Sequence, residues 1–327
     1  MNSKRRCLPS LLALLALLPC ALALPVAAQT WPDHPIRFIV PFAPGGANDL
    51  MGRAAAEAVS KKLGQPVVVE NKPGAGQIVG SDFVAKAKPD GYTLLAAGVP
   101  IAFNTALGRK LPYDAVRDFT PLSLVVTQPL LIVVHPSVPA NSMKDLLAYA
   151  KAQPAALHYT SGGIGSYGHL WWEMFRDKQG VAGQHVPYNG VAGALKDVMG
   201  GQVPLLIDAI VPTGTQVQAG TVRGIAIVGA QRAKSLPNVP TLAEQGYAGF
   251  DAAPFYGVLG PAGMPAPATA KLHATLAKAL TNPTLREKLQ ELGFDVVAST
   301  PDAYAKLIKS EIVRWSTVVK TQSIKVE

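Results

Sequence analysis

Short β-branched runs alternate with stretches of helical periodicity between Trp31 and Ala97. The hydrophobic pattern predicts strands over 36–40, 67–71 and 93–97, with helices over 50–63 and 77–87 between them. The apolar residues of the first helix recur at helical spacing and form one stripe, made of Leu50, Met51, Ala54, Ala55, Ala58, Val59 and Leu63. Strand, helix and strand joined by short links predict a parallel sheet covered by helices.

A second set of alternating elements fills the middle of the chain. The extended stretches 119–126 and 130–134, split by Gln128-Pro129, are interpreted as a crossing between two domains, and 255–259 as the return. Between the crossings the pattern predicts helices over 142–152, 166–178, 191–199 and 213–219 and strands over 157–160, 184–186, 204–208 and 223–228. Three further helices are expected over 266–280, 283–292 and 301–320.

A chain that crosses out and back builds one domain from both of its ends and another from its middle. We therefore expect an α/β fold with two αβ domains joined by two crossing strands. The first domain is discontinuous and takes residues 29–126 and 253–327, and the second takes residues 127–252. Two crossings form a hinge, and the cleft between the domains is a common place for a small ligand.

The first 28 residues have the features of a secretory signal peptide. A basic start over 4–6 is followed by an apolar stretch over 8–24 and by the small-residue cleavage site Val26-Ala27-Ala28. We therefore expect a periplasmic protein with cleavage near Ala28. Both cysteines, Cys7 and Cys20, lie inside the signal, so the mature protein has no disulfide, thiolate nucleophile or cysteine-bound metal.

Composition narrows the class of protein further. Hydrophobic residues make up 49% of the chain and charged residues 16%, which excludes a mostly disordered protein. Removing the signal takes three of the 30 basic residues and no acid, so 27 basic residues face 21 acidic ones and the net charge falls from +9 to +6. The chain contains no run of five or more Lys and Arg, so its sequence does not indicate a nucleic-acid-binding face. No apolar run after the signal is long enough to span a bilayer.

A glycine-containing loop joins the first strand to the first helix. Adjacent glycines let the backbone turn tightly, and the helix start adds unpaired N–H groups and positive dipole potential, so the loop is a plausible seat for a carboxylate. The candidate ligand residues here are Phe42, Ala43, Pro44, Gly45, Gly46, Ala47 and Asp49. The alternative is an ordinary turn in which Asn48 or Asp49 caps the helix.

A second glycine loop again follows a strand and opens a helix. It contributes the candidates Ser161, Gly163, Gly165, Ser166 and His169. Although Gly163-x-Gly165-x-x-Gly168 has the spacing of a dinucleotide fingerprint, the acidic residue that would hold a ribose is missing, so no cofactor is predicted. Ser166 and His169 could form a nucleophile and base, but no Gly-x-Ser-x-Gly turn surrounds the serine.

Three further candidates stand at or just after strand ends, which face the crevice in open α/β sheets: Gly98, Tyr188 and Asp208. Asp208 could pair with a ligand amine or accept a hydrogen bond from a ligand hydroxyl. It could equally cap the helix that follows Pro212. Lys and Arg are absent from both glycine loops, so a carboxylate would be held by neutral donors, worth about 1 kcal/mol each.

Many short motifs in one order resemble the extracytoplasmic solute receptors of tripartite tricarboxylate transporters, often called Bug receptors. The resemblance covers essentially the whole mature chain and rests on residues 40–46 with Asp49, 69–76, 89–94, 111–114 with 118–119, 165–166 with 169–170, 186–188, 239–241 and 260–263.

The resemblance implies a Venus-flytrap, periplasmic-binding-protein-like fold that closes on small carboxylates and delivers them to tripartite tricarboxylate-type membrane transporter subunits. It also implies that the loops matching 42–47 and 161–166 grip a carboxylate, partly through water. We expect no catalysis, no metal and a monomer. The alternatives are an exported hydrolase or oxidoreductase that uses Ser166 and His169, and an orphan carboxylate sensor for a membrane kinase.

The chain departs from the family pattern at three places. Many relatives read Pro-Tyr-Lys-Gly where this chain has Asn189 in the third position, and Phe-Asp-Asn where it has Ile207-Asp208-Ala209. Many also carry Pro in place of Ala43. The shared grip on one carboxylate should survive these changes, whereas the residues that contact the rest of the ligand differ.

Overall fold

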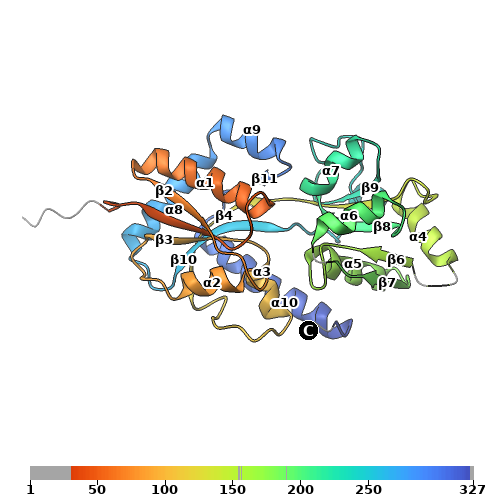
Figure 1. Cartoon of the computed structure of the whole chain (residues 1–327), viewed down its shortest axis with the longest axis horizontal. Helices are drawn as coiled ribbons and strands as arrows, with labels where there is room; N and C mark the ends of the chain where they lie inside the picture. Colours follow the sequence, from red (N-terminus) through yellow and green to blue (C-terminus); the bar gives the residue numbers. More distant parts are fainter. Residues whose placement is uncertain (1–30, 154, 156, 189, 325–327) are drawn as a thin grey trace, which may run out of the picture.

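The computed structural model describes residues 31–324 except 154, 156 and 189, and it shows two α/β lobes joined by two crossing segments (Figure 1). This confirms the predicted α/β fold of two αβ domains. The predicted signal peptide, with Cys7 and Cys20, lies outside the described residues, as does Asn189. Within the described part of the chain, the helices are too short or too polar to cross a membrane.

The first lobe contains a six-stranded sheet in the order β11-β4-β10-β3-β1-β2. β1 pairs in parallel with β2 and β3, whereas β10 runs antiparallel to β3 and β4, and β11 antiparallel to β4. The strands are β1 (Ile36–Val40), β2 (Val67–Asn71), β3 (Thr93–Ala97), β4 (Phe119–Thr127), β10 (Phe255–Pro261) and β11 (Asp295–Val296). The helices are α1 (Ala47–Leu63), α2 (Ile78–Ala85), α3 (Pro100–Ala106), α8 (Ala266–Leu280), α9 (Pro283–Glu291) and α10 (Pro301–Thr321).

The second lobe contains a five-stranded sheet in the order β7-β6-β8-β5-β9. β6 pairs in parallel with β7 and β8, and β5 runs antiparallel between β8 and β9. The strands are β5 (Leu130–Val134), β6 (Leu157–Thr160), β7 (Gly183–Val186), β8 (Leu205–Ala209) and β9 (Arg223–Val228). The helices are α4 (Met143–Ala152), α5 (Tyr167–Lys178), α6 (Val191–Met199) and α7 (Ile210–Gln218), and a 3₁₀ turn, η1, covers Ala243–Gln245.

The two crossing segments are hydrogen-bonded to each other. The backbone N–H of Gln128, between β4 and β5, donates to the carbonyl of Pro254 at 3.0 Å. The Gln128 side chain donates from Nε2 to the hydroxyl of Tyr256 on β10 at 2.6 Å. Both crossings therefore turn about one shared point, which is the arrangement expected of a hinge.

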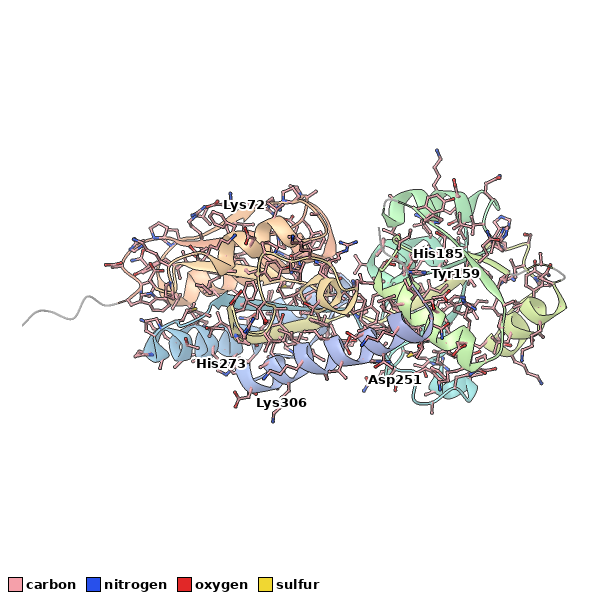
Figure 2. The ribbon with its side chains drawn as sticks, turned by 90° about the horizontal axis from the view of Figure 1, so that it is seen from below. Lys72, Tyr159, His185, Asp251, His273 and Lys306 are labelled. Carbon is pink, nitrogen blue, oxygen red and sulfur yellow. The ribbon has the colours of Figure 1, made fainter. Side chains whose placement is uncertain are left out.

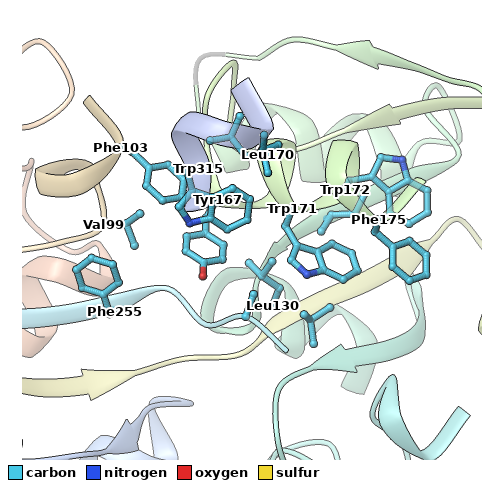
Figure 3. Packing of buried hydrophobic residues seen from close by; sticks show 14 of the residues in the cluster. Val99, Phe103, Leu130, Tyr167, Leu170, Trp171, Trp172, Phe175, Phe255 and Trp315 are labelled. Carbon is cyan, nitrogen blue, oxygen red and sulfur yellow. The ribbon is translucent and has the colours of Figure 1, made fainter. Parts of the chain in front are cut away.

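The hydrophobic core continues from one lobe into the other through aromatic side chains. Tyr167, in the first turn of α5, packs against Phe103 of α3 and Trp315 of α10, with ring centroids 5.1 Å away in each case (Figure 3). Glu311 of α10 is buried and accepts hydrogen bonds from Trp315 Nε1 at 2.7 Å and from the Tyr167 hydroxyl at 3.3 Å. The C-terminal helix, which runs along the first lobe toward the second, therefore holds both lobes (Figure 2).

Most elements agree with the hydrophobic pattern, and six strands have the predicted bounds. The sequence analysis missed α3 and β11. α3 has seven residues, and its four consecutive residues 101–104 are all buried, so it is too short and too uniformly buried to give a helical period. β11 is only two residues long and depends on pairing with β4, far away in the sequence.

Gly168 provides a test of how the first turn of α5 packs on the sheet. A Cβ at this position would lie 2.1 Å from the carbonyl oxygen of Ile207 in β8, so Gly168→Ala must push the helix off the strand. We expect the free energy of unfolding to fall by about 3 kcal/mol in urea titrations. The control in the same lobe is Gly200→Ala, where the nearest atom to the new Cβ is 3.5 Å away and the backbone is ordinary. Equal stability of the two variants would contradict the packing described.

Candidate functional site

A cavity of about 410 Å³ lies between the lobes, and residues of both lobes and of the crossings line it. The first lobe contributes Phe42, Gly76, Asn104 and Arg109, among others, and the second contributes Gly162, Gly165, Ser166 and Asp208. Leu130, Pro254 and Tyr256 come from the crossing region. A cavity with walls on both sides of a hinge changes shape when the lobes rotate, so a ligand that touches both walls affects closure.

Phe42, which lines the cavity, opens the loop that leads into the start of α1. Gly45 has a φ of +90°, which glycine adopts without strain, and Gly46 is the N-cap residue. No side chain caps the helix, so neither Asn48 nor Asp49 fills the capping role of the alternative interpretation. The N–H groups of the first turn have no intrahelical acceptors and remain available to an anion.

Asp49 supports this loop from behind. Its Oδ2 accepts hydrogen bonds from the N–H of Gly45 at 3.0 Å and from Arg53 Nε at 2.9 Å, and its Oδ1 accepts from Asn71 Nδ2 at 2.8 Å. Burial raises the pKa of the Asp49 carboxyl, but the hydrogen bonds from Arg53, Asn71 and Gly45 outweigh it and hold the pKa below its ordinary value. The carboxylate is therefore ionised and fully engaged in shaping the loop.

The start of α5 forms the second lobe's side and is held by an internal network. Ser166 is the N-cap residue, and its Oγ accepts from the backbone N–H of His169 at 3.3 Å. The same hydroxyl donates to Ser161 Oγ at 2.9 Å, and Ser161 Oγ lies 2.9 Å from His185 Nε2. The His169 ring accepts at Nδ1 from the N–H of Gly165 at 3.0 Å. The network fixes the loop so that its remaining N–H groups are preorganised.

This network does not contain the nucleophile and base considered from the sequence. The Ser166 hydroxyl contacts the backbone of His169 and not its ring, which is turned toward Gly165. Ser161 does contact a histidine ring, that of His185, but its side chain is fully buried. A substrate in the cleft could not reach it.

His169 and His185 stack with ring centroids 4.0 Å apart. His185 also lies next to Tyr159, with ring centroids 5.1 Å apart (Figure 2). Burial lowers the pKa of His169 to about 4, and burial together with the nearby His169 lowers the pKa of His185 to about 3. Both rings are therefore neutral near neutral pH, which leaves a ring nitrogen free to accept the N–H of Gly165.

Asp208 lies at the end of β8 and faces the cleft. Its Oδ1 accepts the N–H of Ala209 at 2.7 Å, while α7 begins at Ile210 with Ala209 as an N-cap residue without a side-chain bond, so Asp208 does not cap a helix after Pro212. Burial raises the pKa of the Asp208 carboxyl to about 6, against the N–H groups of Ala209 and Gly162, which lower it. This carboxyl can accept a hydrogen bond from a ligand amine or hydroxyl.

Two polar residues near the cleft were missed from the sequence. Arg109 follows α3, a helix that the pattern did not reveal, and lines the cavity. Asn48 is buried at 4% exposure in the first turn of α1, and neither Oδ1 nor Nδ2 has a partner in the part of the chain that the structure describes. A Cβ on Gly98 would lie 2.9 Å from that Nδ2. Asn48 was considered from the sequence only as a helix cap and Arg109 was not considered, so their places at the cleft come from the fold alone.

The predicted ligand residues fall into three groups. Phe42, Gly165, Ser166 and Asp208 line the cavity directly. The stretch Ala43 to Gly46 is an exposed loop that leads into the half-buried Ala47, with Asp49 beneath. Ser161, Gly163 and His169 form the frame of the second loop, Gly98 packs on Asn48, and Tyr188 bonds through its hydroxyl to Asp197. Which of them contact a ligand stays a prediction.

Within the described ranges, no group of three or more His, Cys, Asp and Glu side chains is placed to hold a metal ion.

Comparison with known proteins gives consistent results. The family model described as tripartite tricarboxylate transporter family receptor matches residues 51–324. Protein BugT of Bordetella pertussis is 36% identical over 308 residues, which cover 94% of each chain. Among solved structures, Rpa4515 of R. palustris with adipate has a TM-score of 0.81 and 34% identity, over 90% of this chain and 99% of that chain. MatC from Rhodopseudomonas palustris with bound malate has a TM-score of 0.75 and 32% identity, over 88% and 99%.

The buried histidines predict a loss of stability in acid. An unfolded histidine binds a proton below about pH 6.5, whereas folded His169 resists until about pH 4, so stability is lost as the pH falls between these values. At about pH 5 we expect His169 alone to destabilise the fold by about 2 kcal/mol relative to pH 7.5. His169→Gln keeps an acceptor for Gly165 and should remove this part of the pH dependence in urea unfolding.

Asp208 acts with the opposite sign, because its raised pKa favours the protonated folded state as the pH falls below about 6. Asp208 is present in every variant compared, so its contribution to the pH dependence of stability cancels when the variants are subtracted from one another. The control is Gly200→Ala, which removes no titratable group and should keep the pH dependence of the unchanged protein. If the free energy of unfolding of His169→Gln changed with pH as steeply as that of the unchanged protein, His169 would not be held neutral in the folded state.

Proposed function

The chain belongs to the tripartite tricarboxylate transporter receptor family, and we propose that it captures a small carboxylate in the cleft between its two lobes. Members of this family are solute-binding proteins and not enzymes. The observation that carries the proposal is that Phe42 of the first glycine loop and Ser166 of the second line one cavity, although the loops belong to different lobes.

The ligand carboxylate accepts hydrogen bonds from backbone N–H groups at the starts of α1 and α5, partly through water. Each neutral hydrogen bond contributes about 1 kcal/mol and each helix dipole about 0.3–1 kcal/mol, so several donors from both lobes are needed together. A ligand shifts the hinge only by the difference between its affinities for the closed and open forms. Donors on opposite lobes supply this difference, because the closed form alone offers both sets to one carboxylate.

Two solved relatives support a carboxylate as the ligand class, since their structures are described with adipate and with malate. Membership of this family supports a periplasmic location. We further propose that a signal peptide over residues 1–28 is cleaved near Ala28 and that the mature protein is a monomer. This monomer delivers its ligand to the membrane subunits of a tripartite tricarboxylate-type transporter.

Gly46→Val tests whether the α1 start binds the ligand. A Cβ at Gly46 has no atom within 4 Å and the backbone φ is −81°, so the variant should fold with a melting temperature close to that of the unchanged protein. The valine side chain would occupy the space where a carboxylate approaches the N–H groups. We expect affinity for every carboxylate to fall by about tenfold or more in thermal-shift titrations.

The unchanged protein, refolded free of carried-over ligand, must first show a rise in melting temperature with at least one mono- or dicarboxylate of a panel. Gly200→Ala, far from the cleft, serves as the matched control and should retain that response. No response to any carboxylate would overturn the proposed function. An unreduced rise in the melting temperature of Gly46→Val would show that the start of α1 does not bind the carboxylate.

Asp208→Asn tests whether Asp208 contacts a substituent of the ligand and not its carboxylate. The amide keeps an acceptor for the N–H of Ala209 but lacks the charge that pairs with a ligand ammonium group, so affinity for amino-substituted carboxylates should fall by about tenfold relative to that for unsubstituted carboxylates. In the unchanged protein, affinity for an amino-substituted ligand should decline below about pH 6, where Asp208 takes up a proton. Calorimetric titration over this range checks both effects, and equal losses for all ligands would refute the division.

A further inference from the structure

The two lobes also touch on the side of the crossing segments opposite α10, where α9 and α7 lie (Figure 1). The turn between α9 and β11 meets the first residues of α7, because a Cβ on Gly293 would lie 3.2 Å from Cγ2 of Ile210 and 3.4 Å from Cγ2 of Val211. Gly293 has a φ of +84°, which glycine adopts without strain. Val211 is half-buried and packs against hydrophobic clusters of both lobes, so this is an apolar contact between the lobes.

A hydrogen bond extends this contact toward the surface. Lys234, in the segment that follows β9 of the second lobe, donates from Nζ to Oε1 of Gln290 on α9 at 2.7 Å. The bond is exposed and therefore contributes little energy by itself, but it joins the same two lobes as the apolar contact. We call Val211, Lys234, Gln290 and Gly293 together the hinge brace.

The hinge brace spans the first crossing segment. β11 pairs with the last residues of β4, just before Gln128. The first residue of α7 donates its backbone N–H to the carbonyl of Pro129, just after Gln128, at 3.1 Å. One half of the brace is thus fixed to the chain before the hinge and the other half to the chain after it. Bending at Gln128 therefore changes the separation of the two halves.

The segment that carries the brace in the second lobe also leads into the cleft. Asp208, which lines the cavity, precedes Val211 by three residues. Across the cleft, Leu107 of the first lobe lies against the second glycine loop, since a Cβ on Gly165 would lie 2.8 Å from Cδ1 of Leu107. The brace therefore stabilises a conformation in which the walls of the cleft are in contact, and such a contact raises the population of that conformation.

We propose that the hinge brace sets the balance between the open and closed forms, and thereby the apparent affinity for every ligand, although its residues are not among those that line the cavity. This inference rests on the proposed function, because it takes closure around a carboxylate as given. The apparent affinity of a receptor that is mostly open equals its intrinsic affinity multiplied by the closed fraction. A change in the brace therefore changes the affinity for all ligands by one common factor.

Val211→Ala tests the apolar part of the brace. The affinities of two carboxylates of unlike structure, both of which raise the melting temperature of the unchanged protein, are measured by calorimetry. We expect both affinities to fall by about three- to tenfold and by the same factor, because fewer molecules are closed before binding. The matched control is Val217→Ala on the same helix, since Val217 is half-buried and packs against the cluster of the second lobe. It should leave both affinities unchanged, and melting temperatures without ligand show that both variants fold.

A reversible cross-link tests the polar part of the brace in the opposite direction. Both cysteines of the chain lie in residues 1–28, so Lys234→Cys with Gln290→Cys supplies the only two thiols of the mature sequence. A short bis-methanethiosulfonate joins them while a carboxylate is bound. Dissociation of that ligand should slow by about tenfold or more, and dithiothreitol should restore its rate, because the joined brace holds the lobes closed. The control pair, Glu57→Cys with Lys61→Cys one turn apart on α1, should leave dissociation unchanged.

The outcomes distinguish the hinge brace from the proposed function. If no carboxylate binds the unchanged protein, the proposed function fails. If carboxylates bind but Val211→Ala leaves their affinities unchanged, or the cross-link leaves dissociation unchanged, the function stands and the brace is overturned. If Val211→Ala weakens one carboxylate and not the other, Val211 acts on that ligand alone, which also overturns the brace.

Discussion

The first turn of α5 is the constraint on which the rest of the cleft depends. Gly168 lets this turn lie directly on the carbonyl of Ile207 in β8, and Tyr167 packs its ring against those of Phe103 and Trp315 of the other lobe. The same turn carries the N–H groups that follow Ser166. Packing between lobes and the donors of the candidate site are therefore parts of one short segment. Rotation of the lobes cannot change one without moving the other.

Around this segment, some polar side chains hold the shape of the loops and others line the cavity. The glycine loops contain no Lys or Arg, and their own acids and rings, Asp49 and His169, are used to hold backbone shape. Arg109 and Asp208 line the cavity from opposite lobes and are not paired with each other. A loop of neutral donors suits a group common to many ligands, whereas isolated charges distinguish one ligand from another.

The alternation of apolar runs was sufficient to predict most strands and helices, both crossings and the presence of two αβ domains. It was sufficient because these elements bury one face, or an uninterrupted strand, and leave a local period in the sequence. It failed for α3, a seven-residue helix with four consecutive buried residues, and this failure hid the segment that carries Arg109. The remaining misses, such as β11, depend on pairing between distant residues.

The sequence by itself determined the fold class, the two glycine loops and the candidate residues within them, since strand ends, glycines and helix starts have local signatures. Only the tertiary structure decided that Asp49 and His169 support loops, that Asp208 faces the cavity without capping a helix, and that Arg109 and Asn48 lie near it. The physical reason is that these roles depend on neighbours far apart in the chain. A side chain's partners, its burial and hence its charge state are set by what folding places around it.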